Sequence, residues 1–195
     1  MQNEQSKLID LFFEIGTLMD MHRMHSQVLP LSNESIADHS FRVAIIATLL
    51  AERTNNINRE KVIKMAIFHD VAEARTGDAN FIHKFYNNQA EEMAYKEQFT
   101  DIEFGDKIIT LLDEYNKRKT KESLIAKDAD LLDQMLLQQE YLYDRPKDLK
   151  RWQEHTAKSL NTSLGRKLAK IIFKKNPLDW LYNFSEIKKS KNNKK

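Results

Sequence analysis

The sequence predicts an all-α protein, and three observations support that prediction. Only four glycines and three prolines interrupt its 195 residues. Apolar residues recur at helical spacing, and no segment shows the alternating pattern and turn residues of a β-hairpin. Neither a repeat nor a linker long enough to separate two domains is visible. We therefore expect a single helical domain over residues 1–184, followed by a basic, disordered tail over residues 185–195.

The first two helices are predicted from an apolar run and from a capping pattern. The apolar run places one helix over residues 6–19. A polar loop follows, and Ser35 then has the features of an N-cap, with Asp38 three residues later. A serine at the N-cap and an acidic residue at the third helical position together satisfy free N–H groups of a first turn. The second helix is therefore expected to extend from Ser35 to about Arg53.

The later helices are predicted by their start and stop residues. Asn58 is a suitable N-cap for a helix that continues to Gly77, because glycine is favoured just beyond a helix end. Pro146 and Pro177 stand where helices would start, since proline fits the first helical turn. The remaining helices are expected over residues 88–99, 105–116, 120–143, 146–160 and 163–174.

The composition excludes several classes of function. Apolar residues make up 41% and charged residues 31% of the chain, as in an ordinary soluble globular protein. The net charge of +2 is too small to indicate binding to nucleic acid or to a membrane surface. The absence of cysteine excludes disulfides, cysteine-bound zinc and a thiol nucleophile. The first apolar run is interrupted by charged residues and cannot span a bilayer, so a cytoplasmic location is expected.

Three ionisable residues interrupt an apolar stretch in the segment IFHDVAEARTGD, from Ile67 to Asp78. His69 and Glu73 are four residues apart and would share a helix face, with Asp70 about 100° further round. Burying such groups without partners costs several kcal/mol, so they need a metal ion, a partner or contact with solvent. Exposure near a helix end is the simplest explanation, but apolar residues continue after the pair, which favours burial.

A second histidine stands on an apolar helix face. In the segment ESIADHSFRVAIIATLL, His39 falls between Ile36 and Val43. A single histidine in such a place is more often a hydrogen-bonded core residue than a ligand. Together with His69 and its neighbouring carboxylate, however, it indicates a divalent ion. Imidazole and carboxylate ligands suit Mn²⁺, Co²⁺, Fe²⁺, Ni²⁺ or Zn²⁺.

Further ligands are expected in the helix that contains IAKDADLLDQMLLQQEYLY. This stretch is apolar around much of its circumference and includes Asp128, Asp130 and Asp133. Asp128 and Asp130 each share a helix face with apolar residues, so periodicity does not choose between them. It predicts only that one aspartate of this helix is buried.

The motifs ESIADHS, FHD and KDADLLDQ, in this order, resemble the H…HD…D signature of the HD-domain metal-dependent phosphohydrolases. FHDVAEARTGD and DADLLDQMLLQQEY look most like the branch that contains the bacterial 5′-deoxynucleotidases and the HD-domain-containing-protein-2 hydrolases. The similarity extends from about Leu8 to Trp180. It implies an HD-domain helical bundle that hydrolyses small-molecule nucleotides, namely nucleoside and above all deoxyribonucleoside 5′-monophosphates. It is also compatible with a homodimer.

The resemblance implies a role for each residue of the site. Glu73 matches the catalytic glutamate of the family's HDxxE pattern, and Arg23 matches an arginine that helps to bind phosphate. Asp78, in the TGD motif, would contact the sugar hydroxyls or position the loop that carries Arg23. One divalent cation is implied, which would be Mn²⁺, Co²⁺, Fe²⁺, Ni²⁺, Zn²⁺ or Mg²⁺. Its four ligands would be His39, His69, Asp70 and Asp130.

The loops expected to face the substrate depart from the family pattern. The family often has an aromatic residue or a TGW segment after the arginine, whereas this chain reads Met24-His25-Ser26. It commonly has a proline soon after TGD, and here none follows. Three of the histidines outside the motifs, which are His22, His25 and His155, are expected at the surface.

Two alternative functions use the same residues. One is an HD hydrolase of another nucleotide class, such as a triphosphate, a cyclic nucleotide or a guanosine alarmone. The other is a non-enzymatic nucleotide-sensing module that kept the metal. The presence of Glu73 together with all the presumed ligands argues against the second. Glu73 itself would, in the simplest case, be a surface glutamate paired with Arg75.

Overall fold

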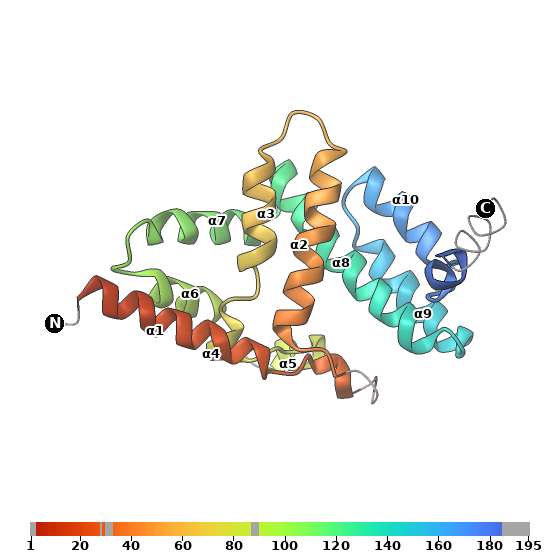
Figure 1. Ribbon diagram of the computed structural model, residues 1–195, viewed down its shortest axis with the longest axis horizontal. Coiled ribbons are helices and arrows are strands. Elements are labelled where there is room, and N and C mark those ends of the chain that lie inside the picture. Colours follow the sequence, from red (N-terminus) through yellow and green to blue (C-terminus); the bar gives the residue numbers. More distant parts are fainter. Residues whose placement is uncertain (1–2, 28, 30–32, 87–89, 185–195) are drawn as a thin grey trace, which may run out of the picture.

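The computed structural model describes residues 3–27, 29, 33–86 and 90–184, and these residues confirm the all-α prediction (Figure 1). Within them, the only extended pairing is an isolated bridge between His22 and Ser35. The tail predicted over residues 185–195 and the predicted helix start at 88 lie outside the described residues. The helices are α1 (Glu4–Gly16), η1 (Thr17–Met19), η2 (Met24–Gln27), α2 (Ile36–Glu52), α3 (Arg59–Phe68), α4 (Glu73–Thr76), α5 (Phe81–Tyr86), α6 (Glu91–Phe99), α7 (Gly105–Lys117), α8 (Lys121–Leu142), α9 (Pro146–Lys158) and α10 (Ser163–Ile172), where η marks a 3₁₀ helix.

The main core lies where α2, α3 and α8 pack against one another. Figure 1 shows α2 and α3 side by side, with α8 crossing behind them toward α9 and α10. Each of the three helices contributes buried apolar side chains, and burial of a valine, leucine or methionine side chain is worth about 1.5–3 kcal/mol. They include Val43, Ala47, Val62, Met65, Ala66, Ala129, Leu132 and Met135. Because the three helices share one rigid core, polar residues on them keep fixed relative positions.

A second apolar cluster fixes the segment between α3 and α4. Val71 and Ala72, from this segment, are buried against side chains of α1, α6 and α7. The partners in this cluster are Leu11, Ala94, Tyr95, Phe99 and Leu112. The residues that flank Val71 and Ala72 are thereby held in place although they are not in a long helix.

The predicted helix starts are confirmed by their hydrogen bonds. Ser35 Oγ accepts from the backbone N–H of Asp38 at 3.1 Å, and Asp38 Oδ2 accepts from the N–H of Ser35 at 3.0 Å. Asn58 Oδ1 accepts from the N–H of Lys61 at 3.1 Å. Pro146 is the first residue of α9. Local capping chemistry therefore determines these boundaries.

The continuous helix predicted from Asn58 to Gly77 is wrong. Helix α3 ends at Phe68, and α4 begins only at Glu73. In between, backbone N–H groups bond three rather than four residues back, as from Glu73 N to Asp70 O at 3.0 Å. The imidazole of His69 lies 2.9 Å from the carbonyl oxygen of Ala66, which the N–H of residue 70 would use in a continuous helix. His69 and Glu73 consequently do not share a helix face.

Smaller differences concern the ends of the chain and one short helix. The first predicted helix ends as an α-helix at Gly16 and continues as the 3₁₀ helix η1. Helix α5 was not predicted from the sequence. Beyond Pro177, the described residues 179–184 are helical, which is consistent with a helix start at this proline. Among the described residues, no helix is both long enough and apolar enough to cross a membrane.

Candidate metal centre

Helix α2 presents the first histidine close to its N-terminus. The capping box at Ser35 fixes the start of the helix, and His39 follows one turn later. The His39 residue is 1% exposed. A backbone hydrogen bond of 2.9 Å from Arg23 N to Glu34 O holds the preceding segment beside the start of this helix. The segment that carries Arg23 and the helix that carries His39 are therefore joined directly.

The turn between α3 and α4 places His69 and Asp70 against His39. The Nε2 atoms of the two imidazoles are 3.3 Å apart. Asp70 Oδ2 is 3.1 Å from His69 Nε2 and 3.5 Å from His39 Nε2. Two ring nitrogens and one carboxylate oxygen, supplied by α2 and by the turn after α3, thus converge on one point.

The Nδ1 atoms of both rings have hydrogen-bond partners, and these partners determine which nitrogen of each ring has the lone pair. His69 Nδ1 is 2.9 Å from the carbonyl oxygen of Ala66, an acceptor only, so Nδ1 must carry the proton. His39 Nδ1 is 2.6 Å from Asp133 Oδ2, and a carboxylate there likewise favours a proton on Nδ1. In the neutral rings, both Nε2 atoms then direct lone pairs toward the same point as Asp70. Such a set of atoms is stable only around a cation, which is either a proton or a metal ion.

The ionisation of the surrounding groups shows that this point attracts positive charge. Burial disfavours protonation of His39, but hydrogen bonds to Asp130 and Asp133 outweigh burial and raise the pKa of His39 to about 9. Burial by itself would raise the pKa of Asp70, yet the adjacent His69 imidazole holds that pKa well below its usual range. The charges around this point therefore favour a cation there, and a metal ion would compete for it with a proton.

Asp130, on α8, stands at the edge of this group. Its Oδ1 is 3.3 Å from His39 Nε2, and its Oδ2 is 2.6 Å from the ammonium group of Lys127. Burial would raise the pKa of Asp130, but the charge of Lys127 and the contact with His39 hold that pKa well below normal. The ligand atoms of His39, His69 and Asp70 all lie within 4.8 Å of one another. The structure thus brings together all four residues predicted as ligands, three of them tightly.

The other two aspartates of α8 are fully buried and have separate partners. Asp128 accepts hydrogen bonds from the backbone N–H groups of Asn161 at 2.7 Å and Thr162 at 2.8 Å, and so anchors the start of α10. Asp133 is the partner of the His39 ring. The sequence therefore predicted fewer buried aspartates on this helix than the structure has, because two of them are completely buried.

Arg42 joins Asp133 to two further carboxylates. Its Nε donates to Asp133 Oδ1, and its terminal nitrogens lie 2.9 Å from Glu140 Oε1 and 3.3 Å from Glu34 Oε1. A second group of possible metal ligands consists of Glu34, His39 and Asp133. Because the guanidinium group of Arg42 already neutralises that group, the point between the two Nε2 atoms is the better cation site.

Glu73 begins α4 and is only 4% exposed. Its Oε2 atom is buried and has no hydrogen-bond partner among the described residues. Arg75, its simplest partner on sequence grounds, instead binds Glu14, with 2.6 Å between Nε and Oε1. Burial and the negative charges of Asp70 and Asp78 raise the pKa of Glu73 to about 10. Glu73 is thus a buried carboxyl group near the cation site that readily takes up a proton.

Arg23 lies against the site rather than in solvent. The residue is 8% exposed, and its Nη1 is 3.1 Å from Asp70 Oδ2. Its Nε is 3.6 Å from Asp78 Oδ2 and has no hydrogen-bond partner among the described residues. The same oxygen of Asp78 accepts a 2.8 Å hydrogen bond from the backbone N–H of Met24. Asp78 therefore positions the segment that carries Arg23, as one of its two predicted roles requires.

Comparison with known proteins places this arrangement in a family. A family model described as the HD domain matches residues 15–172. The chain belongs to the HD domain family. The 5′-deoxynucleotidase HDDC2 of Dictyostelium discoideum is 32% identical over 151 residues, which cover 70% of this chain and 78% of that protein. Its mouse counterpart is 30% identical over 131 residues, which cover 64% of this chain and 65% of the mouse protein.

Solved structures show the same fold. The structure of a conserved hypothetical protein from Pyrococcus furiosus matches with a TM-score of 0.70 and 33% identity, covering 84% of this chain and 98% of that one. A protein from Magnetospirillum magnetotacticum described as a predicted metal-dependent phosphohydrolase matches with a TM-score of 0.71 over 87% of this chain and 91% of that one. At 20% identity, the second match shows the fold alone.

Two residues of this HD domain, Asp133 and Arg42, support the His39 ring although the sequence analysis assigned neither of them this role. Asp133 follows Asp130 by one helical turn, and Arg42 follows His39 by the same interval, so that spacing was the available signal. The prediction of a surface position is wrong for His25. Its Nδ1 is buried, and its ring packs edge-to-face on Trp152 with 5.8 Å between ring centroids. His22 and His155 are exposed, as expected.

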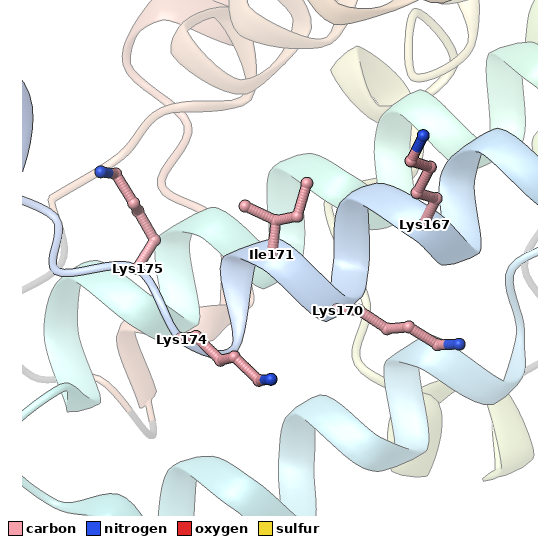
Figure 2. A pocket seen from close by; sticks show the side chains of 5 residues that line it. All are labelled: Lys167, Lys170, Ile171, Lys174 and Lys175. Atoms are coloured by element: carbon pink, nitrogen blue, oxygen red, sulfur yellow. The ribbon is translucent and has the colours of Figure 1, made fainter.

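A hollow on α10 is unrelated to the HD motif. Figure 2 shows the side chains that line it, which are Lys167, Lys170, Ile171, Lys174 and Lys175. No lining residue is a carboxylate or an imidazole, so the hollow has no metal ligands.

Proposed function

We propose that this HD domain is a divalent-cation-dependent phosphohydrolase that releases orthophosphate from nucleoside 5′-monophosphates, with a preference for deoxyribonucleotides. The main support is the convergence of His39 Nε2, His69 Nε2 and Asp70 Oδ2 on one point, with a buried arginine beside it. The names of the curated relatives, which are 5′-deoxynucleotidases, point to the same reaction.

The donor set fits one divalent cation. His39, His69, Asp70 and Asp130 would hold it, because two neutral imidazoles and two ionised carboxylates are typical ligands of Mn²⁺, Co²⁺, Fe²⁺, Ni²⁺ or Zn²⁺. Mg²⁺ is less well matched, since it prefers oxygen ligands. When bound, such a cation polarises a phosphoryl oxygen and lowers the pKa of a coordinated water.

Arg23 is the group that would hold the phosphate. Its guanidinium group is permanently charged and has a planar set of donors suited to two phosphate oxygens. The contact with Asp70 and the lack of a hydrogen-bond partner for Nε among the described residues support this role, since a phosphate there would lie next to the cation. Burial of Arg23 strengthens its attraction for a doubly charged phosphate, because little water screens it.

Glu73 would move the proton in the reaction. Its buried, unpartnered oxygen supports a role toward a water or a substrate oxygen rather than a structural one. A carboxyl group so placed would accept a proton from the attacking water and return one to the leaving group. The positive charge of a bound cation would favour the ionised carboxylate that the first of these steps needs.

The remaining features concern the rest of the chain. We take residues 1–184 as one HD phosphohydrolase domain and residues 185–195 as a separate basic tail. Asp78 would act through the loop of Arg23, and nucleotides rather than nucleic acid or membranes would be the partners. A homodimer is compatible with the exposed apolar side chains of Phe41, Ile45 and Leu49 along α2.

The test is a substrate panel with defined metal content. Chelator-treated protein is reloaded with Mn²⁺, Co²⁺, Ni²⁺, Zn²⁺ or Mg²⁺, and orthophosphate release is measured from ribo- and deoxyribonucleoside mono- and triphosphates, cyclic nucleotides and guanosine polyphosphates. We expect release from the monophosphates. Tripolyphosphate released from triphosphates, or intact monophosphates with every cation, would establish a different hydrolase or a sensing module instead.

A pair of matched variants connects this activity to the site. Asp70→Asn removes one charge from the cation site and is expected to abolish both bound metal and phosphate release. Asp144→Asn makes the same chemical change at an exposed position and is expected to alter neither. Equal activity of the two variants would contradict the assignment of Asp70.

A further inference from the structure

The two oxygens of Asp130 have different partners, and Lys127 is the partner of one of them. The ammonium group of Lys127 is 2.6 Å from Oδ2, whereas Oδ1 is 3.3 Å from His39 Nε2. The side chain of Asp130 is 13% exposed and that of Lys127 is 33% exposed, so water has only limited access to the contact between them. Oδ1 therefore faces the presumed cation, and Oδ2 faces the lysine.

Asp70, the other carboxylate ligand, is arranged differently. A single oxygen, Oδ2, is the atom that approaches both imidazoles, and the same oxygen lies 3.1 Å from Arg23 Nη1. A bound cation would compete with Arg23 for that oxygen, whereas it could bind Oδ1 of Asp130 while Lys127 stays on Oδ2. Of these two basic residues, Lys127 is therefore the one that can keep its carboxylate contact when the cation is bound.

The contact with Lys127 limits how Asp130 can coordinate a cation. A carboxylate can coordinate through one oxygen or through both. A hydrogen bond between an ammonium group and a carboxylate is among the strong ones in proteins, and it engages the lone pairs that Oδ2 would need for coordination. Coordination through Oδ1 alone is therefore favoured. When each ligand gives one atom, an octahedral ion such as Mn²⁺ keeps positions for a water and a phosphate oxygen, and a second atom from Asp130 would take one of them.

We propose that Lys127 is a positioning residue that keeps Asp130 a one-oxygen ligand, so that the cation retains a coordination position for water or phosphate. This inference rests on the cation site of the proposed function. The simplest alternative is an ordinary ion pair of the helix surface, since Lys127 and Asp130 are three residues apart on α8. The two explanations differ in what they predict for the bound cation, because a surface pair would not change its coordination.

The test counts the water molecules bound to Mn²⁺ in the loaded protein, from the broadening of its electron paramagnetic resonance lines in ¹⁷O-labelled water. We expect Lys127→Met to lose about one of the bound waters of the wild type, because Oδ2 becomes free to coordinate. Its calorimetric Mn²⁺ affinity should be equal or higher, since a positive charge beside the site is removed. Its release of orthophosphate from thymidine 5′-monophosphate should slow by about 10–100-fold.

Two further variants separate this role from a general effect on the helix. Lys127→Arg keeps a positive charge and donors for Oδ2, so it should retain the wild-type number of bound waters. Lys121→Met makes the same chemical change as Lys127→Met at an exposed position of α8, and it should alter neither the water number nor the Mn²⁺ affinity.

The possible outcomes distinguish this inference from the proposed function. A wild-type water number in Lys127→Met would establish an ordinary ion pair and overturn the proposal. A lower Mn²⁺ affinity in that variant would also overturn it, because Lys127 would then only hold Asp130 in place. If the wild type binds Mn²⁺ but hydrolyses no nucleotide, the proposed function fails while the water number still decides this inference. If the wild type binds no Mn²⁺, both fail.

Discussion

Replacement of Asp133 by asparagine should weaken cation binding although Asp133 is not itself an expected ligand. Its Oδ2 is 2.6 Å from His39 Nδ1, and both side chains are 1% exposed, so water cannot replace the contact. Partners of this kind keep a ligating imidazole in the right tautomer, and their loss typically costs about 10–100-fold in metal affinity. This range corresponds to about 1.4–2.8 kcal/mol.

The geometry around Asp133 favours the upper end of this range. The other oxygen, Oδ1, accepts a hydrogen bond from Arg42 Nε. If the amide group of asparagine turns its oxygen to His39, its nitrogen meets the N–H of Arg42, and two donors then face each other. If it turns its nitrogen to His39, the ring must accept at Nδ1 and carry its proton on Nε2, which cannot bind a metal. Either orientation of the amide therefore opposes cation binding.

The assay is calorimetric titration of chelator-treated protein with Mn²⁺. Glu140→Gln is the matched control, because Glu140 contacts Arg42 through both carboxylate oxygens, at 2.9 and 3.0 Å, but is not bonded to His39 in the structure. We expect a change of less than about threefold for this control, and thermal unfolding of both variants should show intact folds. Wild-type affinity of Asp133→Asn, or an equal loss in Glu140→Gln, would refute the reasoning.

Three other predictions follow from the same structure. Glu73→Gln should keep its bound metal, as measured by elemental analysis. Its kcat should fall by about 10²–10⁴-fold, which is the usual effect of removing a positioned acid–base group. Loss of the metal as well would show that Glu73 is a ligand. Mn²⁺ affinity should fall as the pH drops below about 9, because Asp130 and Asp133 outweigh burial and raise the pKa of His39 to that value. Below that pH the imidazole holds a proton that must leave before Nε2 can bind a metal. Calorimetry between pH 6 and 9 would detect this change in affinity, and a flat profile would exclude His39 as a ligand. Asp128→Ala should lower the free energy of unfolding by about 2–4 kcal/mol in urea denaturation, because the backbone N–H groups of Asn161 and Thr162 before α10 lose the buried carboxylate that accepts from them. A change below about 1 kcal/mol would show that other acceptors replace it.

The sequence by itself determined the fold class and most helix boundaries of this protein. Ser35, Asn58 and Pro146 act through hydrogen bonds or steric limits within a few residues, and these local effects are the same in any tertiary setting. The sequence also indicated that His39 and His69 needed an unusual environment, because each stood among apolar residues. It did not indicate that the helix stops between these motifs, since the bond from His69 to Ala66 O depends on the folded turn.

Only the tertiary structure decided which polar groups meet. The three aspartates of α8 lie within six residues, yet one anchors the segment before α10, one lies beside Lys127 and the cation site, and one holds the His39 ring. Periodicity could not separate these roles, because it reports only how a residue is placed on its own helix. Which side chain reaches which partner is set by how α2, α8 and α10 pack, and that packing depends on contacts between residues far apart in the chain. His25 is half-buried for the same reason, since α8 and α9 supply side chains that contact its ring.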